Sequence, residues 1–216
     1  MPAFSADVST SALPQAAVAS PSSWRDRLRW IPFAIWFLVI AGVMASLAIS
    51  HWFSLPHPER RDDRLAAGLH ELLHGTSDWA AVHVLYTDCQ CSQRIIDHLE
   101  SSKRPEKIHE VVLLVGDDPS IERRLAGKSY EIVRLTPDQL GARFGIIGAP
   151  LFVFVDPERT VRYIGGYTQR KQGPDIRDLA IMTEVQAGVA VADLPLFGCA
   201  IAQRLKELAD PSATKR

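Results

Sequence analysis

Two of the chain's three cysteines, Cys89 and Cys91, lie in the segment LYTDCQCSQRIIDHL with a single glutamine between them. A strand-like run precedes the pair and a helix-like run follows it. At such a junction, free backbone N–H groups and the positive end of the helix dipole stabilise a thiolate, the nucleophilic form of cysteine. The carboxylate of Asp88 opposes this effect where it lies close. The pair therefore indicates thiol–disulfide exchange or binding of a soft metal ion.

The bulk composition narrows the classes of function. The chain has 216 residues, enough for one domain with a core and an additional segment, and its net charge of -1 gives no electrostatic case for nucleic-acid binding. Three cysteines cannot form a complete disulfide framework, because one is always left over. The third is Cys199, in the segment LFGCA near the end of the chain.

The order of elements that must position the cysteines predicts an α/β domain. A βαβ unit comes first and a β-hairpin followed by a helix comes second, so we expect a mixed central sheet with helices on both sides. The expected elements are a helix over 62–74, strands over 79–87 and 107–116, helices over 92–102, 119–126, 137–144 and 174–187, a short edge strand over 130–135, and a hairpin over 151–167.

An apolar segment precedes this domain. Residues 31–50 carry no charge, and twenty helical residues cover a hydrocarbon layer of roughly 30 Å. Trp30 and Trp52 flank the segment, as aromatic residues do at membrane interfaces. We therefore expect one transmembrane helix. A cleaved signal peptide is the alternative, although its apolar region is usually shorter, about 7–15 residues.

The charges beside this segment predict its orientation. Arg25, Arg27 and Arg29 lie directly before it and favour a cytoplasmic N-terminus. We therefore expect a single-pass protein of a bacterial inner membrane, whose soluble domain faces the periplasm. The predicted organisation is a disordered tail over 1–30, the transmembrane helix over 31–50, a linker over 51–59 and the α/β domain over 60–210.

At the cysteine pair the chain resembles the thioredoxin-like superfamily, over roughly residues 60–190. The matching parts are the strand AAVHVLYT, the cysteines and helix after it, and FGIIGAP running into the hairpin LFVFVDPERTVRYIGGY. The resemblance implies a three-layer α/β/α sandwich. It also implies that Pro150 forms a cis peptide bond, faces the redox cysteines and helps to bind the backbone of protein thiol or disulfide substrates.

The departure from the family concerns the second cysteine. The family pattern is Cys-x-x-Cys, whereas this chain has Cys-Gln-Cys-Ser. The apolar residues of the helix place Cys89 in the position of the attacking cysteine and Ser92 in that of its partner, which leaves Cys91 as an additional thiol. Either Cys91 or Cys199 then resolves the mixed disulfide, and Cys199 does so only where the tail folds back over the site.

Three further expectations complete the prediction. The same register places His83 where the family carries a buried ionisable group, so His83 is a candidate proton acceptor; its alternatives are a solvent-facing or hydrogen-bonded core histidine. We expect a thiol–disulfide oxidoreductase with no cofactor. The alternatives are a copper(I)-binding protein using Cys89 and Cys91, for which no histidine has a diagnostic spacing, and a redox-sensing module without turnover.

Overall fold

The structure is a computed structural model that describes residues 24–52 and 54–201, and the chain divides into two compact units after Ser50, near the end of its first helix. The first unit contains helix α1 (Trp24–Trp52), which starts within the segment expected to be a tail and exposes large apolar side chains from Trp30 to Met44. In the part of the chain that the structure describes, no helix is both long and apolar enough to cross a membrane. Residues 1–23 of the predicted tail and residues 202–210 of the predicted domain lie outside the described residues.

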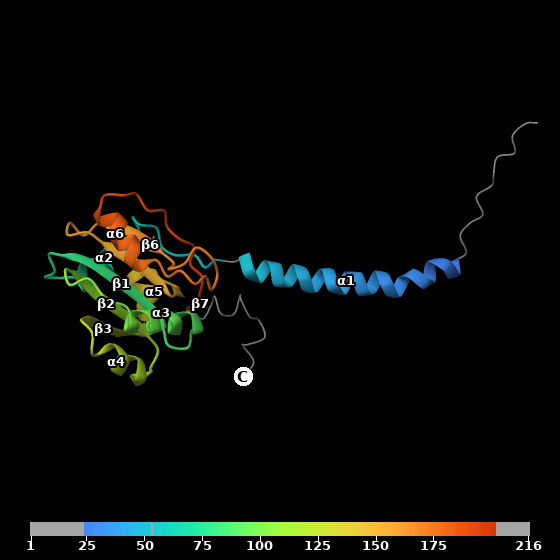
Figure 1. The fold of residues 1–216 in the computed structure, drawn as a ribbon, viewed down its shortest axis with the longest axis horizontal. Helices are drawn as coiled ribbons and strands as arrows, with labels where there is room; N and C mark the ends of the chain where they lie inside the picture. The colour runs from blue at the N-terminus through green and yellow to red at the C-terminus, as the bar shows by residue number, and fades with distance from the viewer. Residues whose placement is uncertain (1–23, 53, 202–216) are drawn as a thin grey trace, which may run out of the picture. The chain divides into compact units, whose positions relative to one another are not determined.

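The second unit is built on a five-stranded mixed sheet in the order β3-β2-β1-β5-β6 (Figure 1). Its strands β1, β2 and β3 are parallel, whereas β5 runs antiparallel to β1 and β6 antiparallel to β5. The strands are β1 (Trp79–Tyr86), β2 (Ile108–Val115), β3 (Tyr130–Leu135), β5 (Leu151–Val155) and β6 (Val161–Gly165). Strands β1, β2 and β5 are almost wholly buried, because helices cover both faces of the sheet.

Two separate hydrophobic clusters lie on the two faces. On one face, leucines of α2 and Leu140 and Phe144 of α5 pack against the sheet. On the other, isoleucines of α3 pack with residues of α4 and α6 and with Phe152 of β5. The helices are α2 (Asp63–Leu72), α3 (Gln90–Ser101), α4 (Pro119–Leu125), α5 (Pro137–Phe144) and α6 (Asp178–Gln186). The layers are therefore helix, mixed sheet and helix, as the sequence predicts.

Local signals account for several helix ends. Asp62 caps α2 by accepting hydrogen bonds from the backbone N–H groups of Arg64 and Leu65. Thr136 and Gln139 form a reciprocal capping box at the start of α5. That helix ends at Gly145, whose φ of 68° lies in the left-handed region that favours glycine.

The structure differs from the sequence-based expectation at three places. Helix α3 begins at Gln90, directly after Cys89, and not at Ser92. Helix α6 begins at Asp178 and not at Pro174, because the backbone N–H of Arg177 donates to the Tyr167 carbonyl and holds the preceding residues against another loop. A small two-stranded sheet of β4 (Gly148–Ala149) and β7 (Cys199–Ala200) was not predicted.

Candidate functional site

Cys89 is fixed at the junction between β1 and α3. It is the N-cap residue of α3, its backbone N–H donates to the Tyr86 carbonyl at 3.1 Å, and its carbonyl accepts from the Gln93 N–H at 3.0 Å. The Gln93 side chain donates to the Thr87 carbonyl at 2.8 Å and braces the same turn. Cys89 is completely buried. The sulfur is therefore held at the start of the helix by backbone contacts on both sides.

Cys89 forms a disulfide with Cys199, and Cys91 is a free thiol. The two bonded cysteines are 110 residues apart in sequence, with 5.9 Å between their Cα atoms. Cys199 is partly exposed, in contrast to Cys89. Of the two pairings that the sequence left open, the structure contains the one with the distant cysteine.

The tail reaches Cys89 by pairing with the strand before Pro150. In the antiparallel sheet, Cys199 of β7 lies opposite Ala149 of β4, and Ala200 lies opposite Gly148. The pairing continues past β7, where the Ile201 N–H donates to the Ile147 carbonyl at 2.8 Å. The Ala149–Pro150 peptide bond is cis. Cys89 Sγ lies 3.7 Å from the Ala149 carbonyl oxygen, to which a reduced Cys89 thiol can donate.

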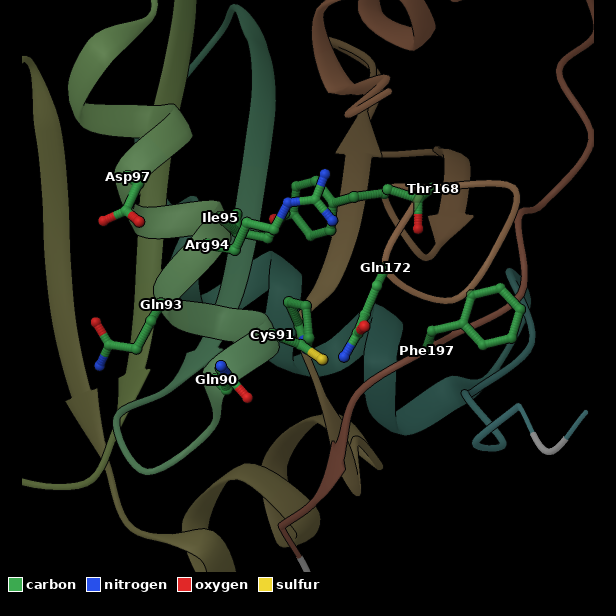
Figure 2. A pocket seen from close by; sticks show the side chains of 11 residues that line it. Gln90, Cys91, Gln93, Arg94, Ile95, Asp97, Thr168, Gln172 and Phe197 are labelled. Atoms are coloured by element: carbon green, nitrogen blue, oxygen red, sulfur yellow. The ribbon is translucent and has the colours of Figure 1, made fainter. Parts of the chain in front are cut away.

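A pocket of about 450 Å³ opens beside the disulfide. Figure 2 shows the free sulfur of Cys91 pointing into it, with Gln172 and Thr168 on the facing loop. Its lining is more apolar than polar, and Ile95, Pro150, Tyr167 and Phe197 contribute to the apolar part. The residues that line it are Gln90, Cys91, Gln93, Arg94, Ile95, Asp97, Pro150, Tyr167, Thr168, Gln172 and Phe197.

Ser92 has a structural contact at the position where the family carries its second cysteine. Its side chain is fully buried, and its Oγ accepts a hydrogen bond from the Tyr86 backbone N–H at 3.1 Å. The hydroxyl therefore ties the first turn of α3 to the end of β1.

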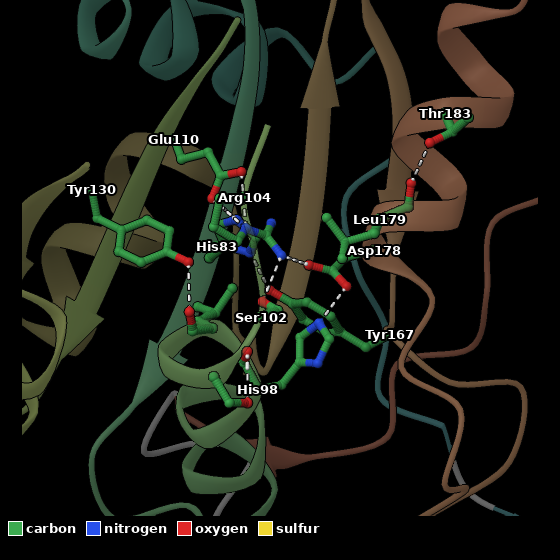
Figure 3. Close-up of polar contacts among 12 residues, drawn as sticks. His83, His98, Ser102, Arg104, Glu110, Tyr130, Tyr167, Asp178, Leu179 and Thr183 are labelled. Carbon is green, nitrogen blue, oxygen red and sulfur yellow. Dashed lines mark hydrogen bonds and ion pairs between the residues drawn. The ribbon is translucent and has the colours of Figure 1, made fainter. Parts of the chain in front are cut away.

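His83 lies deep in the domain, on the face of the sheet covered by α3 and α6 (Figure 3). Its Nδ1 is 2.9 Å from the Tyr167 hydroxyl, and its ring stacks on Phe152 with 5.2 Å between centroids. Its Nε2 lies 3.6 Å from a Glu110 carboxylate oxygen. Among the described residues, no hydrogen bond or ion pair joins His83 to a cysteine. The structure therefore shows a hydrogen-bonded core histidine, and its role as proton acceptor stays a prediction.

Arg104 connects this histidine region to α6. Its guanidinium donates to Glu110 from Nε at 2.9 Å and to Asp178 from Nη1 at 2.7 Å. Asp178 also accepts from His98 Nε2 at 2.8 Å, and the His98 side chain is partly buried. We call His83, His98, Arg104, Glu110 and Asp178 the buried ion network.

The electrostatics of the network favour charged carboxylates. Burial by itself raises the pKa of Glu110, but the facing His83 and the Arg104 guanidinium outweigh it and bring that pKa below its ordinary value. Asp178 follows the same pattern: the hydrogen bond from His98 and the charge of Arg104 overcome burial and hold its pKa far below the usual range. The sequence analysis missed this network, although Glu110, an acidic residue within a largely apolar strand, was a signal of it.

Three observations together define the fold: the order of strands in the sheet, the βαβ unit followed by a hairpin and a helix, and a cis-proline beside a cysteine at the start of a helix. The chain has a thioredoxin-like fold. This confirms the fold that the resemblance drawn from the sequence implied. The roles of Cys89, Cys91, Cys199, Pro150 and His83 in exchange stay predictions.

Comparison with known proteins gave matches among solved structures only. No protein-family model and no curated protein matched the chain. An uncharacterised conserved protein from Geobacillus kaustophilus aligns with a TM-score of 0.46 and 15% identity, over 58% of this chain and 77% of its own. A hypothetical protein from Sinorhizobium meliloti 1021 gives 0.45 and 16%, over 70% and 91%. The thioredoxin domain of a thiol-disulfide oxidoreductase from Bacteroides vulgatus gives 0.31 and 16%, over 39% and 67%.

The oxidation state of Cys89 and the arrangement of possible metal ligands bear on the copper(I) hypothesis. Cys89 is oxidised here and offers no thiolate to a metal ion in this state. Within residues 24–52 and 54–201, no group of three histidine, cysteine or carboxylate residues is arranged to hold a metal. The copper(I) and redox-sensing hypotheses stay predictions.

Proposed function

We propose that this protein is a thiol–disulfide oxidoreductase in which Cys89 reacts with protein thiols or disulfides and Cys199 resolves the product. The observation that carries the proposal is the Cys89–Cys199 disulfide, placed at a helix start and beside cis-Pro150. A bond between residues 110 positions apart requires the tail to return to the site. Cys91 remains a free thiol outside this pair.

The chemistry needs two exchange steps. In the reduced protein the Cys89 thiolate attacks a substrate disulfide, forms a mixed disulfide and releases one substrate thiolate. The Cys199 thiolate then attacks Cys89 Sγ, which forms the Cys89–Cys199 bond and releases the second substrate thiolate, and both substrate thiolates take up protons. Two electrons pass from the cysteine pair to the substrate, and the reverse sequence oxidises a substrate dithiol.

Thiol counting and turnover test the proposal on the purified full chain in mild detergent. Under denaturing conditions we expect one titratable thiol, that of Cys91, in the oxidised protein and three after reduction. In insulin-disulfide reduction driven by dithiothreitol, Cys89→Ser is expected to lower the rate by about tenfold or more, because the attacking sulfur is gone. Unchanged turnover in Cys89→Ser would contradict the proposal.

The other two cysteines supply matched variants. Cys199→Ser is expected to accumulate mixed disulfides with insulin chains, because Cys89 is still able to attack but nothing resolves it. Cys91→Ser is expected to stay within about twofold of the unsubstituted protein, because Cys91 lies outside the observed bond. A large loss in Cys91→Ser together with an intact Cys199→Ser would assign resolution to Cys91.

We also propose that residues 31–50 anchor the protein in a bacterial inner membrane, with the thioredoxin-like domain in the periplasm. The support is the uncharged sequence, the arginines before it and the exposed apolar side chains of α1. We expect the full chain to stay in the membrane pellet after alkaline extraction, and its domain to be digested by protease added to spheroplasts. Release at alkaline pH, or protection from protease, would contradict the anchor or its orientation, respectively.

A further inference from the structure

The short strand β4 pairs with β7 along one of its edges. Only Gly148 and Ala149 form β4, and both pair with the tail. The main-chain groups of such an edge bind any extended polypeptide, while pockets along the strand select its side chains. The tail is held just before β7, where Leu196 is buried and its carbonyl accepts from the Leu55 N–H at 2.8 Å. The edge is therefore occupied by a strand with a cysteine bound to Cys89.

The residue before the bound cysteine has no room for a side chain. A Cβ atom on Gly198 would collide with the Ala149 carbonyl oxygen and lie 2.7 Å from Cδ of Pro150. Real Cβ atoms do not approach backbone atoms so closely, and neither Ala149 nor Pro150 has a flexible end that moves away. Any strand that brings a cysteine to Cys89 in this register therefore needs glycine at the preceding position.

The residue two positions before the cysteine faces the pocket. Phe197 is half-buried and lines the pocket together with Pro150, Cys91 and Gln172 (Figure 2). Aromatic rings bury a large apolar area at small entropic cost, and Pro150 adds apolar surface to the lining of the same pocket. The sequence Phe197-Gly198-Cys199 thus matches the edge at three consecutive positions.

We propose that β7 pairs with β4 in the same way as a substrate strand does. The preferred substrates are then polypeptides with an extended segment in which an aromatic residue and a glycine directly precede the reacting cysteine. This inference rests on the proposed function. The strand β4 accepts one partner on this edge, so a substrate strand and β7 exclude each other. A substrate disulfide therefore binds while β7 is displaced.

Because β7 and a substrate strand exclude each other on β4, resolution of the mixed disulfide is coupled to release of the substrate. When the Cys199 thiolate attacks Cys89 Sγ, the substrate thiolate leaves and β7 takes the place of the substrate strand on β4. Bond exchange and strand exchange then happen together. The partner is a protein with a flexible segment, because a cysteine inside a folded sheet cannot add to a two-residue edge.

Activated peptides test the substrate rule. The full chain carrying Cys91→Ser and Cys199→Ser keeps Cys89 as its one thiol and is reacted, reduced, with the hexapeptides LFGCAI, LFACAI and LAGCAI, each bearing thionitrobenzoate on its cysteine. Cys89 attacks the peptide sulfur and releases the coloured thionitrobenzoate thiolate. We expect LFGCAI to react about tenfold faster than LFACAI and several-fold faster than LAGCAI. A mixed disulfide of thionitrobenzoate and mercaptoethanol, which has no strand, measures the intrinsic reactivity of Cys89.

The outcomes separate the two proposals. Equal rates for the three peptides, with a reactive Cys89 toward the small disulfide, would overturn the substrate rule and leave the oxidoreductase proposal intact. A Cys89 that reacts with none of the four compounds would overturn the oxidoreductase proposal. As a second readout, adding Gly198→Ala to the unsubstituted chain is expected to slow re-formation of the Cys89–Cys199 bond by several-fold, because the new Cβ opposes the pairing of β7. An unchanged rate of re-formation would contradict the steric role of Gly198.

Discussion

At the level of single residues, the site differs from a Cys-x-x-Cys site, in which two positions at the start of the helix supply both sulfur atoms. Here three positions share these features. Cys89 holds the helix start, Ser92 fills the usual position of the second cysteine, and Cys199 supplies the second sulfur from the tail. Ser92 Oγ accepts from the Tyr86 backbone N–H, so the hydroxyl has a structural contact that a thiol makes less well. Position 92 is nevertheless close enough to Cys89, at the start of the helix, for cysteines at the two positions to form a pair.

Ser92→Cys tests whether the local site still supports the family chemistry. In a chain carrying Cys91→Ser and Cys199→Ser, we expect the added thiol to form a disulfide with Cys89 on oxidation, because the first turn of the helix brings the two positions together. Titratable thiols after oxidation would then fall from two to none, and insulin reduction would rise about tenfold above the parent variant. Ser92→Ala in the same background is the control. Two thiols that persist after oxidation would show that the backbone here no longer permits the pair.

At the level of elements, the buried ion network joins β2 and α6 through one guanidinium. Arg104 bridges Glu110 of β2 and Asp178 at the start of α6, and both carboxylates are almost fully buried. Replacing Arg104 with methionine leaves two buried charges without their cation, which costs about 3–5 kcal/mol of the free energy of unfolding. Urea titration measures this loss. The exposed Arg134, which pairs with Glu122 and Asp117, is the control, and Arg134→Met is expected to change stability little.

The same network predicts acid sensitivity. Glu110 and Asp178 have pKa values below those of unfolded chains, which are about 4.3 and 3.9. Below about pH 4 the unfolded state therefore binds more protons than the folded state, so stability is fully present above that pH and falls as the pH drops toward the folded pKa values. Urea midpoints measured at about pH 5, 4 and 3 are expected to fall more steeply for the unsubstituted chain than for Arg104→Met, whose carboxylates lose the cation that lowers their pKa. Parallel pH profiles would contradict this assignment.

The sequence predicted the regular elements better than the contacts made across the fold. Helix α5 begins at a proline after a threonine cap, and its expected range agrees with the structure. The central strands follow from unbroken apolar runs. The two-residue strands β4 and β7 have no periodic pattern, because their pairing depends on a partner about fifty residues away in the chain. The shortened α6 was missed for the same reason, since Arg104 and the Tyr167 carbonyl, which contact its first residues from other parts of the chain, fix its start.

The residues of the candidate site likewise divide into those that the sequence located and those that it did not. Cys89 and Cys91 were located by their spacing at a strand–helix junction, and Pro150 by the resemblance to the thioredoxin-like superfamily. Cys199 was only one of two possible partners, because a tail outside the periodic elements gives no register. The polar network around His83 could not be predicted as a whole, since its members come from β1, α3, β2, α6 and the segment after α3, and Glu110 alone gave a signal of it.

At the level of the whole molecule, the disulfide closes most of the described domain into one loop. The bonded cysteines are separated by 110 residues, and the tail crosses back to the start of the domain, where Arg60 forms an ion pair with Asp193. Reduction opens this loop, but the Arg60–Asp193 pair and the Leu55–Leu196 bridge still hold the tail near the site. The reduced tail therefore remains close enough to compete with a substrate strand.

Loop closure makes the stability of the domain depend on its redox state. In the chain-entropy description, a disulfide that closes about 110 residues stabilises the folded state by about 4–5 kcal/mol, because it restricts the unfolded chain. We expect the free energy of unfolding of the domain to fall by up to this amount when dithiothreitol is added during urea titration. Cys199→Ser should show the lower stability with and without reductant, whereas Cys91→Ser should respond to reductant like the unsubstituted chain. If reduction leaves the urea midpoint unchanged, the bond does not restrict the unfolded chain, and the tail is held by its other contacts alone.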